Sequence, residues 1–175
     1  MQKTLPRPID RLSGEKGQAI IEVAIAVPVL LVLFMGVFDY SRAIHAQSVI
    51  TNMSREAANL ISRANMNLSG NELTDFQNVM DLVGKTAQPL NMTAQGMMYM
   101  YKVERVNNTN TITLQLAWNG SSLSPKPSMN ASAAALGGIT LSQGQVAYGV
   151  EVYYQYQSVF LRNLFKPTLA SRSIF

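Results

Sequence analysis

A long apolar stretch near the N-terminus is the strongest pattern in the chain. Residues 23–38 are sixteen consecutive positions without a charged side chain or a side-chain amide, and Glu22 and Asp39 bracket them. Counted from Ala19 to Tyr40 the stretch has 22 residues, about 33 Å of helix, which is enough to cross a bilayer. Because the stretch is apolar on every face, it predicts a transmembrane helix over residues 18–41 rather than the core helix of a small soluble protein.

A helical period continues beyond the apolar stretch. Apolar residues recur there at alternating spacings of four and three: Ala46, Ile50, Met53, Ala57, Leu60 and Ala64. This spacing is typical of an amphipathic helix, so one helix is expected from about Gln18 to Ala64. A short second helix is expected next, with a capping box formed by Ser69 and Glu72 and with Gly84 at its end.

The second half of the chain changes to a two-residue period. Residues 99–106 and 111–118 alternate around the turn-rich NNTN, which predicts a hairpin, and residues 145–156 and 168–175 are candidates for two more strands. Residues 119–144 are rich in Gly, Ser, Pro and Asn and are expected to form an exposed loop. The predicted fold class is α+β: one long N-terminal helix packed on a small antiparallel sheet of three to four strands, with residues 42–175 as its domain.

Composition and charge exclude several functions. The chain has 14 Lys and Arg against 10 Asp and Glu, a net charge of +4 that is not gathered into a stripe, so nucleic acid is not an expected partner. It has no cysteine and one histidine, His45, which argues against a metal site. Asp75 and Asp81 fall on different faces of the short helix and are interpreted as solvated. We therefore expect no enzyme activity and no cofactor.

Charges that flank the apolar stretch predict its orientation. Four basic residues precede the stretch, against two acidic ones, whereas Arg42 alone follows within the next dozen positions. Under the positive-inside rule the N-terminus stays in the cytoplasm and everything after Tyr40 lies outside. An ordinary cleaved signal peptide is disfavoured, because the stretch is longer than its usual apolar region and no small-x-small cleavage site follows.

A short motif then joins the basic segment to the apolar stretch. Gly17 is followed five positions later by Glu22, and this layout resembles a prepilin signal. The segment GQAIIEVAIAVPVLLVLFMGVFDYSRAI resembles the N-terminal segment of TadE-like proteins, minor pilins or pseudopilins of the tight-adherence (Tad, or Flp) branch of type IV pili. The positions that carry this resemblance are Gly17, Glu22, Pro28, Gly36, Asp39, Tyr40, Ser41 and Arg42. The chain departs from the family pattern at Val23, where an aromatic residue usually follows the glutamate.

The resemblance implies a function in pilus assembly. A prepilin peptidase would cut after Gly17 on the cytoplasmic side, so that residues 1–17 are the leader, Gln18 becomes the first residue and Glu22 the fifth. The expected product is a single-pass inner-membrane protein with a periplasmic pilin-like domain, either incorporated in a surface pilus for adhesion or held at its base. Its expected partners are the lipid bilayer, other Tad pilins and pseudopilins, and the inner-membrane assembly platform. The alternative is a signal-anchored extracytoplasmic binding or sensor domain, which would keep residues 1–17.

Three charged positions of the motif, Glu22, Asp39 and Arg42, call for a chemical reason. A carboxylate at membrane depth costs about 2.5 to 3.5 kcal/mol unless it is paired. Cleavage after Gly17 would supply a partner for Glu22, the new α-ammonium of Gln18 on the same or a neighbouring chain. Asp39 and Arg42 are three apart on one helical face and can form an ion pair at the outer interface. A simple marking of the membrane boundary explains these two residues equally well.

Overall fold

The computed structural model describes the chain except for residues 1–8, 65–70, 124–137, 161 and 163–165. Two compact units make up the chain, residues 1–41 and residues 42–175. Helix α1 (Ile9–Ala64) runs through the boundary between them, and it begins before the expected start at Gln18. The second unit, called the domain below, also contains helices α2 (Glu72–Thr86) and α3 (Met92–Gln95) and four strands.

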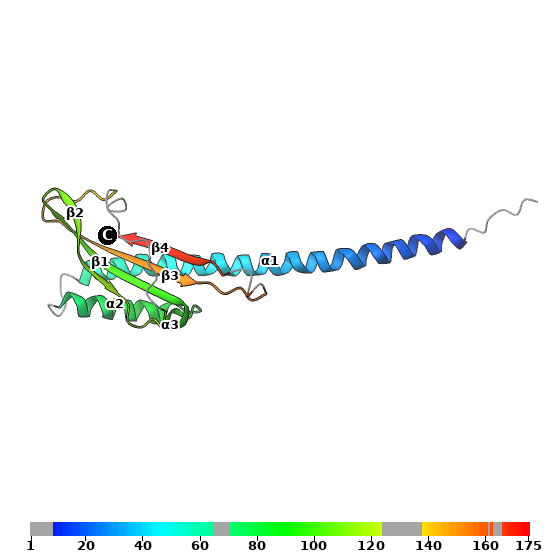
Figure 1. Cartoon of the computed structure of the whole chain (residues 1–175), viewed down its shortest axis with the longest axis horizontal. Helices are drawn as coiled ribbons and strands as arrows, with labels where there is room; N and C mark the ends of the chain where they lie inside the picture. The colour runs from blue at the N-terminus through cyan, green and yellow to red at the C-terminus, as the bar shows by residue number, and fades with distance from the viewer. Residues whose placement is uncertain (1–8, 65–70, 124–137, 161, 163–165) are drawn as a thin grey trace, which may run out of the picture. The chain divides into compact units, whose positions relative to one another are not determined.

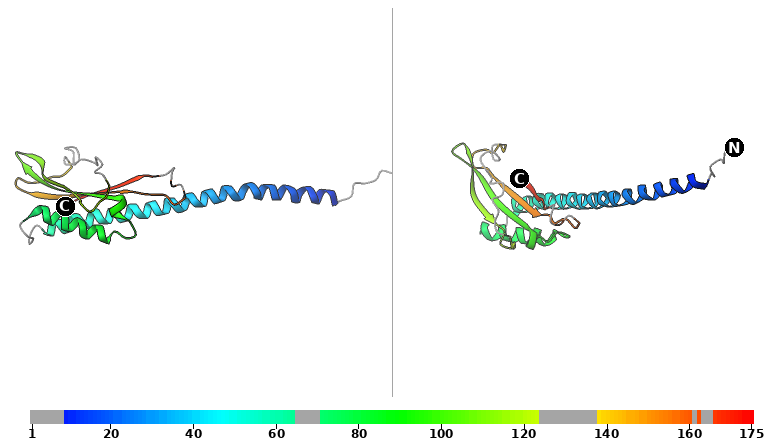
Figure 2. Two further views of the ribbon diagram at one scale, coloured as in Figure 1. Left: turned by 60° about the horizontal axis from the view of Figure 1, so that its bottom comes forward. Right: turned by 45° about the vertical axis from the view of Figure 1, so that its right-hand side comes forward.

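The strands form one antiparallel sheet in the order β2-β1-β3-β4. They are β1 (Gly96–Val106), β2 (Thr109–Ala117), β3 (Val146–Gln155) and β4 (Thr168–Ile174). Figures 1 and 2 show α2 and the part of α1 that belongs to the domain against the same face of the sheet. The predicted α+β class, with one long helix packed on a four-stranded sheet, is therefore confirmed.

The hairpin between β1 and β2 is tighter than predicted. Asn107 and Asn108 have φ angles of 49° and 67°, and asparagine adopts this left-handed region more readily than most residues. Two such residues complete a hairpin turn. Thr109 and Asn110, expected in the turn, therefore belong to β2 and pair with β1.

The main core lies between the helices and the sheet. Seven apolar residues of α1 are buried there: Ala43, Ala46, Ile50, Met53, Ala57, Ala58 and Ile61. Met98 and Met100 of β1 and Val150 and Val152 of β3 face them and are fully buried. Both methionines fill space in the core, as methionine does in irregular gaps.

A polar seam joins α1 to the outer strand β4. Ser54 is fully buried, and its Oγ shares hydrogen bonds of 3.0 Å with the hydroxyls of Ser171 and Ser173. Gln47 Nε2 donates to the carbonyl oxygen of Ala170 over 3.0 Å. These bonds fix the position of β4 along the helix axis, which apolar contacts alone would leave open.

Helix α2 differs from the prediction at both ends. Its N-cap is Asn71, which makes no side-chain capping bond, so Glu72 is the first helical residue and the predicted capping box is wrong. Ser69 lies outside the described residues. The Glu72 carboxylate instead accepts a 2.6 Å bond from Lys102 Nζ of β1, and this bond raises the pKa of Lys102.

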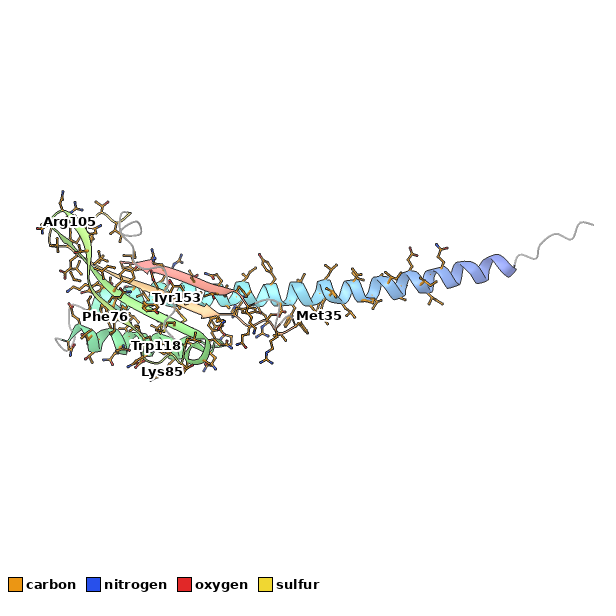
Figure 3. All side chains as sticks on the ribbon, viewed as in Figure 1. Met35, Phe76, Lys85, Arg105, Trp118 and Tyr153 are labelled. Atoms are coloured by element: carbon orange, nitrogen blue, oxygen red, sulfur yellow. The ribbon has the colours of Figure 1, made fainter. Side chains whose placement is uncertain are left out.

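Trp118 explains the other differences on α2 (Figure 3). The helix continues past Gly84 to Thr86. A Cβ at Gly84 would lie 2.8 Å from Trp118 Cζ2, so the glycine provides space for the indole ring instead of ending the helix. Trp118 Nε1 donates to Asp81 Oδ1 over 2.6 Å. Asp75 is buried and Asp81 is half-buried under this bond, so the interpretation of both aspartates as solvated is wrong.

The far face of the sheet carries a second, smaller cluster. Tyr101 and Val103 of β1 and Ala147 of β3 are buried there together with Leu141. Leu141 falls within the segment expected to be an exposed loop, and it is only 6% exposed. That expectation is therefore wrong at this end of the segment, because an apolar side chain is needed to cover the sheet. Residues 124–137 of the segment lie outside the described residues.

On this face the backbone of Gly149 lies directly against the Tyr101 side chain. It pairs with Tyr101 across β1 and β3, and a Cβ at Gly149 would lie closer than 3.0 Å to three atoms of the Tyr101 side chain. We expect Gly149→Val to destabilise the domain by about 1 to 3 kcal/mol, because either the tyrosine ring or the strand must move. Thermal unfolding of the full chain in detergent micelles measures this as a fall in melting temperature.

Gly138→Val is the matched control. Gly138 is exposed, and nothing lies within 4 Å of where its Cβ would be. The same substitution there should leave the melting temperature nearly unchanged. Equal melting temperatures for the two variants would contradict the packing of Tyr101 over Gly149.

Candidate membrane and processing segment

From Gly17 onward, the first unit buries almost none of its apolar surface. Every residue from Gly17 to Phe34 is exposed, although the helical conformation is continuous. Its most apolar 18-residue window is 0% buried, and α1 is long and apolar enough to cross a membrane. The contrast with the part of α1 after Arg42, where seven apolar side chains are buried, divides the helix into two chemically different halves.

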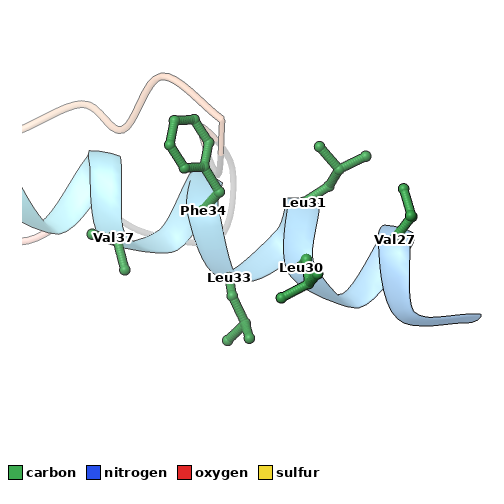
Figure 4. A pocket seen from close by; sticks show the side chains of 6 residues that line it. All are labelled: Val27, Leu30, Leu31, Leu33, Phe34 and Val37. Carbon is green, nitrogen blue, oxygen red and sulfur yellow. The ribbon is translucent and has the colours of Figure 1, made fainter. Parts of the chain in front are cut away.

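Large apolar side chains project from successive turns of this segment (Figure 4). They border a shallow hollow that is lined entirely by α1, and its lining residues are Val27, Leu30, Leu31, Leu33, Phe34 and Val37. Their exposed fractions range from 47% at Val27 to 68% at Val37. An apolar surface of this size needs lipid or other apolar chains around it, since in water it would drive association.

The structure places the motif glycines where packing within the chain does not require them. No atom lies within 4 Å of a Cβ built at Gly17 or at Gly36. Glycine in a helix interior is destabilising by roughly 0.5 to 1 kcal/mol relative to alanine. Neither position gains anything within the described chain that compensates for this cost.

Gln18 and Glu22 lie one helical turn apart. Both are exposed, and their i, i+4 spacing on α1 places them on the same face. Side chains of an α-helix lean toward its N-terminus, so the Glu22 carboxylate extends toward the turn that contains Gln18. Pro28 also lies inside the helix, which continues through it.

Asp39, near the end of the motif, is more buried than the sequence suggests. Asp39 is only 2% exposed, whereas Tyr40 next to it is 65% exposed and Arg42 is exposed. Sequence reasoning gave Asp39 a boundary position and did not foresee its burial. The pairing of Asp39 with Arg42 stays a prediction. Among the described residues, no group of three or more His, Asp or Glu side chains is arranged to hold a metal ion.

Comparison with known proteins identifies the same segment. The family model described as TadE-like protein matches residues 17–59. No curated protein and no solved structure matches the chain. The match begins at Gly17, includes the whole apolar stretch and extends into the part of α1 that packs on the sheet. Residues 17–59 are thus a TadE-like segment, as the motif from Gly17 to Arg42 predicts.

Proposed function

We propose that the chain is a minor pilin or pseudopilin that takes part in the assembly or initiation of a Flp-type (Tad) pilus for surface adhesion. The observation that carries the proposal is the TadE-like match over residues 17–59, which spans both halves of α1. The unburied half is suited to lipid before assembly and to the helices of other subunits afterwards. The other half holds the folded domain.

The proposed location is the inner membrane, crossed once. The N-terminus lies in the cytoplasm and the domain in the periplasm, because basic residues are concentrated before the apolar stretch. Its proposed partners are a prepilin peptidase, other Tad pilins and pseudopilins, and the inner-membrane assembly platform. In this role the chain is the substrate of an enzyme and performs no catalysis itself.

Gly17 supports the processing step. The residue costs helix stability, and no neighbour lies within 4 Å of where its Cβ would be. A requirement outside the chain accounts for it: a peptidase must bring its catalytic groups close to the bond between Gly17 and Gln18, and a side chain at residue 17 would hinder that approach. Glycine also lowers the cost of unwinding the helix at the bond.

Coexpression with a prepilin peptidase tests this step. The mature chain should begin at Gln18, and its formal side-chain charge should fall from +4 to +2, because the leader carries four basic and two acidic residues. Gly17→Val should abolish cleavage without loss of protein, since the open surroundings of Gly17 accommodate the valine. Mass spectrometry of the intact protein measures both results.

A matched control is Gly36→Val, which changes the other unpacked glycine of the segment and should leave cleavage normal. A mature protein that still begins at Met1 in the presence of active peptidase would contradict the proposal and favour the signal-anchored sensor domain. Cleavage also reports orientation, because the peptidase works on the cytoplasmic side.

Glu22 supports the assembly step. Once the chain begins at Gln18, an α-ammonium lies one turn before the carboxylate, and the positive end of the helix dipole acts in the same direction. Within a bilayer or a filament core these two opposite charges neutralise each other, either in one chain or between neighbours. Removing one partner of a buried pair costs about 3 to 5 kcal/mol, a value that nearby water and headgroups would lower.

We expect Glu22→Gln to leave the folded domain and the protein level intact and to reduce pilus-dependent attachment strongly. Glutamine keeps the size and one oxygen of glutamate, so the variant tests the charge alone. Glu56→Gln is the control, because Glu56 is an exposed glutamate of the same helix. Surface attachment, cleavage and protein level are compared with the unmodified chain.

Normal attachment of the Glu22→Gln variant at a normal protein level would refute the pairing. Loss of cleavage would instead assign Glu22 to recognition by the peptidase. Loss of attachment with correct cleavage is the result that supports the proposed subunit contact.

A further inference from the structure

A polar pocket opens at the end of the domain where α1 enters it. It has a volume of about 240 Å³, and its lining includes Arg42, His45, Gln95, Tyr154, Tyr156 and Gln157. The remaining lining residues are Ala46, Pro89 and Leu90, so among the described residues no acidic side chain lines the pocket. Arg42 and His45 are both exposed and lie three apart on α1, which places them on one face.

The inner wall of the pocket is held in place by a hydrogen bond. Tyr154 is 6% exposed, and its hydroxyl donates to Gln95 Oε1 over 2.6 Å. Burial raises the pKa of Tyr154, while the positive charge of Arg42 acts on it in the opposite direction. Arg42 is itself one of the residues that line the pocket. An anion that entered would meet cationic and neutral polar groups.

Exposed apolar side chains lie on one side of this pocket. Gln157 also lines a neighbouring hollow together with Ser158, Val159 and Arg162. Val159 and Phe160 are 48% and 46% exposed. The connection from Tyr156 to Pro167 contains Arg162 and Lys166 but no acidic residue. We call Arg42, His45, Gln157, Val159 and Phe160 the interfacial patch.

We propose that the interfacial patch binds the phospholipid headgroups of the bilayer that α1 crosses, with Arg42 and His45 at the phosphates and Val159 and Phe160 in the outermost acyl region. The inference rests on the proposed membrane anchorage. Arg42 directly follows the first unit and lies only two residues after Tyr40, about 3 Å of helix rise. This connection places the Arg42 end of the domain beside the bilayer surface whatever the orientation of the rest.

The chemistry of the patch matches that occupant. Guanidinium groups bind phosphate oxygens through paired hydrogen bonds. Aromatic and aliphatic side chains beside basic ones are typical of protein surfaces that lie in the membrane interface. A second copy of the same patch is a poorer fit, because its Arg42 would repel that of the first. The bilayer is anionic where the patch is basic, and apolar where the patch is apolar.

Single-cysteine labelling tests the proposal, since the chain has no cysteine of its own. Phe160→Cys and the control Val106→Cys each carry a nitroxide in the full chain, reconstituted as one copy per nanodisc of phosphatidylcholine and phosphatidylglycerol. Val106 is 42% exposed, against 46% for Phe160, and lies beside Arg105 in the β1–β2 hairpin (Figure 3). Leu31→Cys is the reference within the apolar helix.

The label at residue 160 should be several-fold less accessible to a water-soluble nickel complex than the label at residue 106, and more accessible to oxygen, which concentrates in the acyl region. Adding Arg42→Gln should bring its nickel accessibility toward that of residue 106. Arg55→Gln, which changes another exposed arginine of α1, should leave it unchanged. Unchanged melting temperatures establish that the variants remain folded.

Equal nickel accessibility at residues 160 and 106, with residue 31 protected, would overturn the proposal and leave the membrane anchor intact. If the nickel complex reached the label at residue 31, both the lipid-binding proposal and the membrane anchor would be overturned. Protection that appears only with two chains per nanodisc would assign the patch to contact between copies. The label at residue 160 could also be protected from nickel by inorganic phosphate in neutral detergent micelles but not by the nanodisc. That result would make the pocket a site for free anions and would likewise refute lipid binding.

Discussion

Close packing of α1 on the sheet is the contact on which the rest of the domain depends. Four of the seven buried apolar residues of α1 are alanines, so the helix backbone approaches the sheet closely and the long side chains of the strands fill the space. Met98, Met100, Val150 and Val152 belong to the same core cluster as these α1 residues. Without α1, a large part of this face of the central strands would be open to water, a surface too apolar to remain solvated.

The packing of α1 on the sheet also determines where β4 and α2 are held. β4 is placed by the hydroxyls of Ser171 and Ser173 on Ser54, and α2 covers the part of the sheet that α1 leaves free. On the far face, Glu151 is 1% exposed and accepts a 2.7 Å hydrogen bond from Arg172 Nε of β4. A buried charge is tolerated there because its partner is on the adjacent strand, so side chains bind the outer strand to α1 on one face and to β3 on the other.

The sequence was informative where one period decided the structure. A fully apolar stretch followed by a four-and-three spacing predicted α1, and alternation predicted the sheet, because burial on one face leaves a regular pattern. The sequence was uninformative where the role of a residue depends on a partner far away in the chain. The roles of Gly84 and Asp81 depend on Trp118, and the role of Glu72 depends on Lys102. No spacing within α2 contains that information. The motif residues Gly17 and Glu22 were found by resemblance, and the pocket beside Arg42 was missed because three separate segments form it.

The seam between Ser54 and Ser173 also has a consequence for the order of folding. These residues are 119 positions apart in the chain. At about 5 to 20 residues per second, the ribosome needs roughly 6 to 24 s to reach β4 after it has made this part of α1. For that time the alanine-rich face of the helix lacks the strand that completes its cover. A nascent chain in this state exposes apolar surface, which makes it prone to aggregation until β4 has been made.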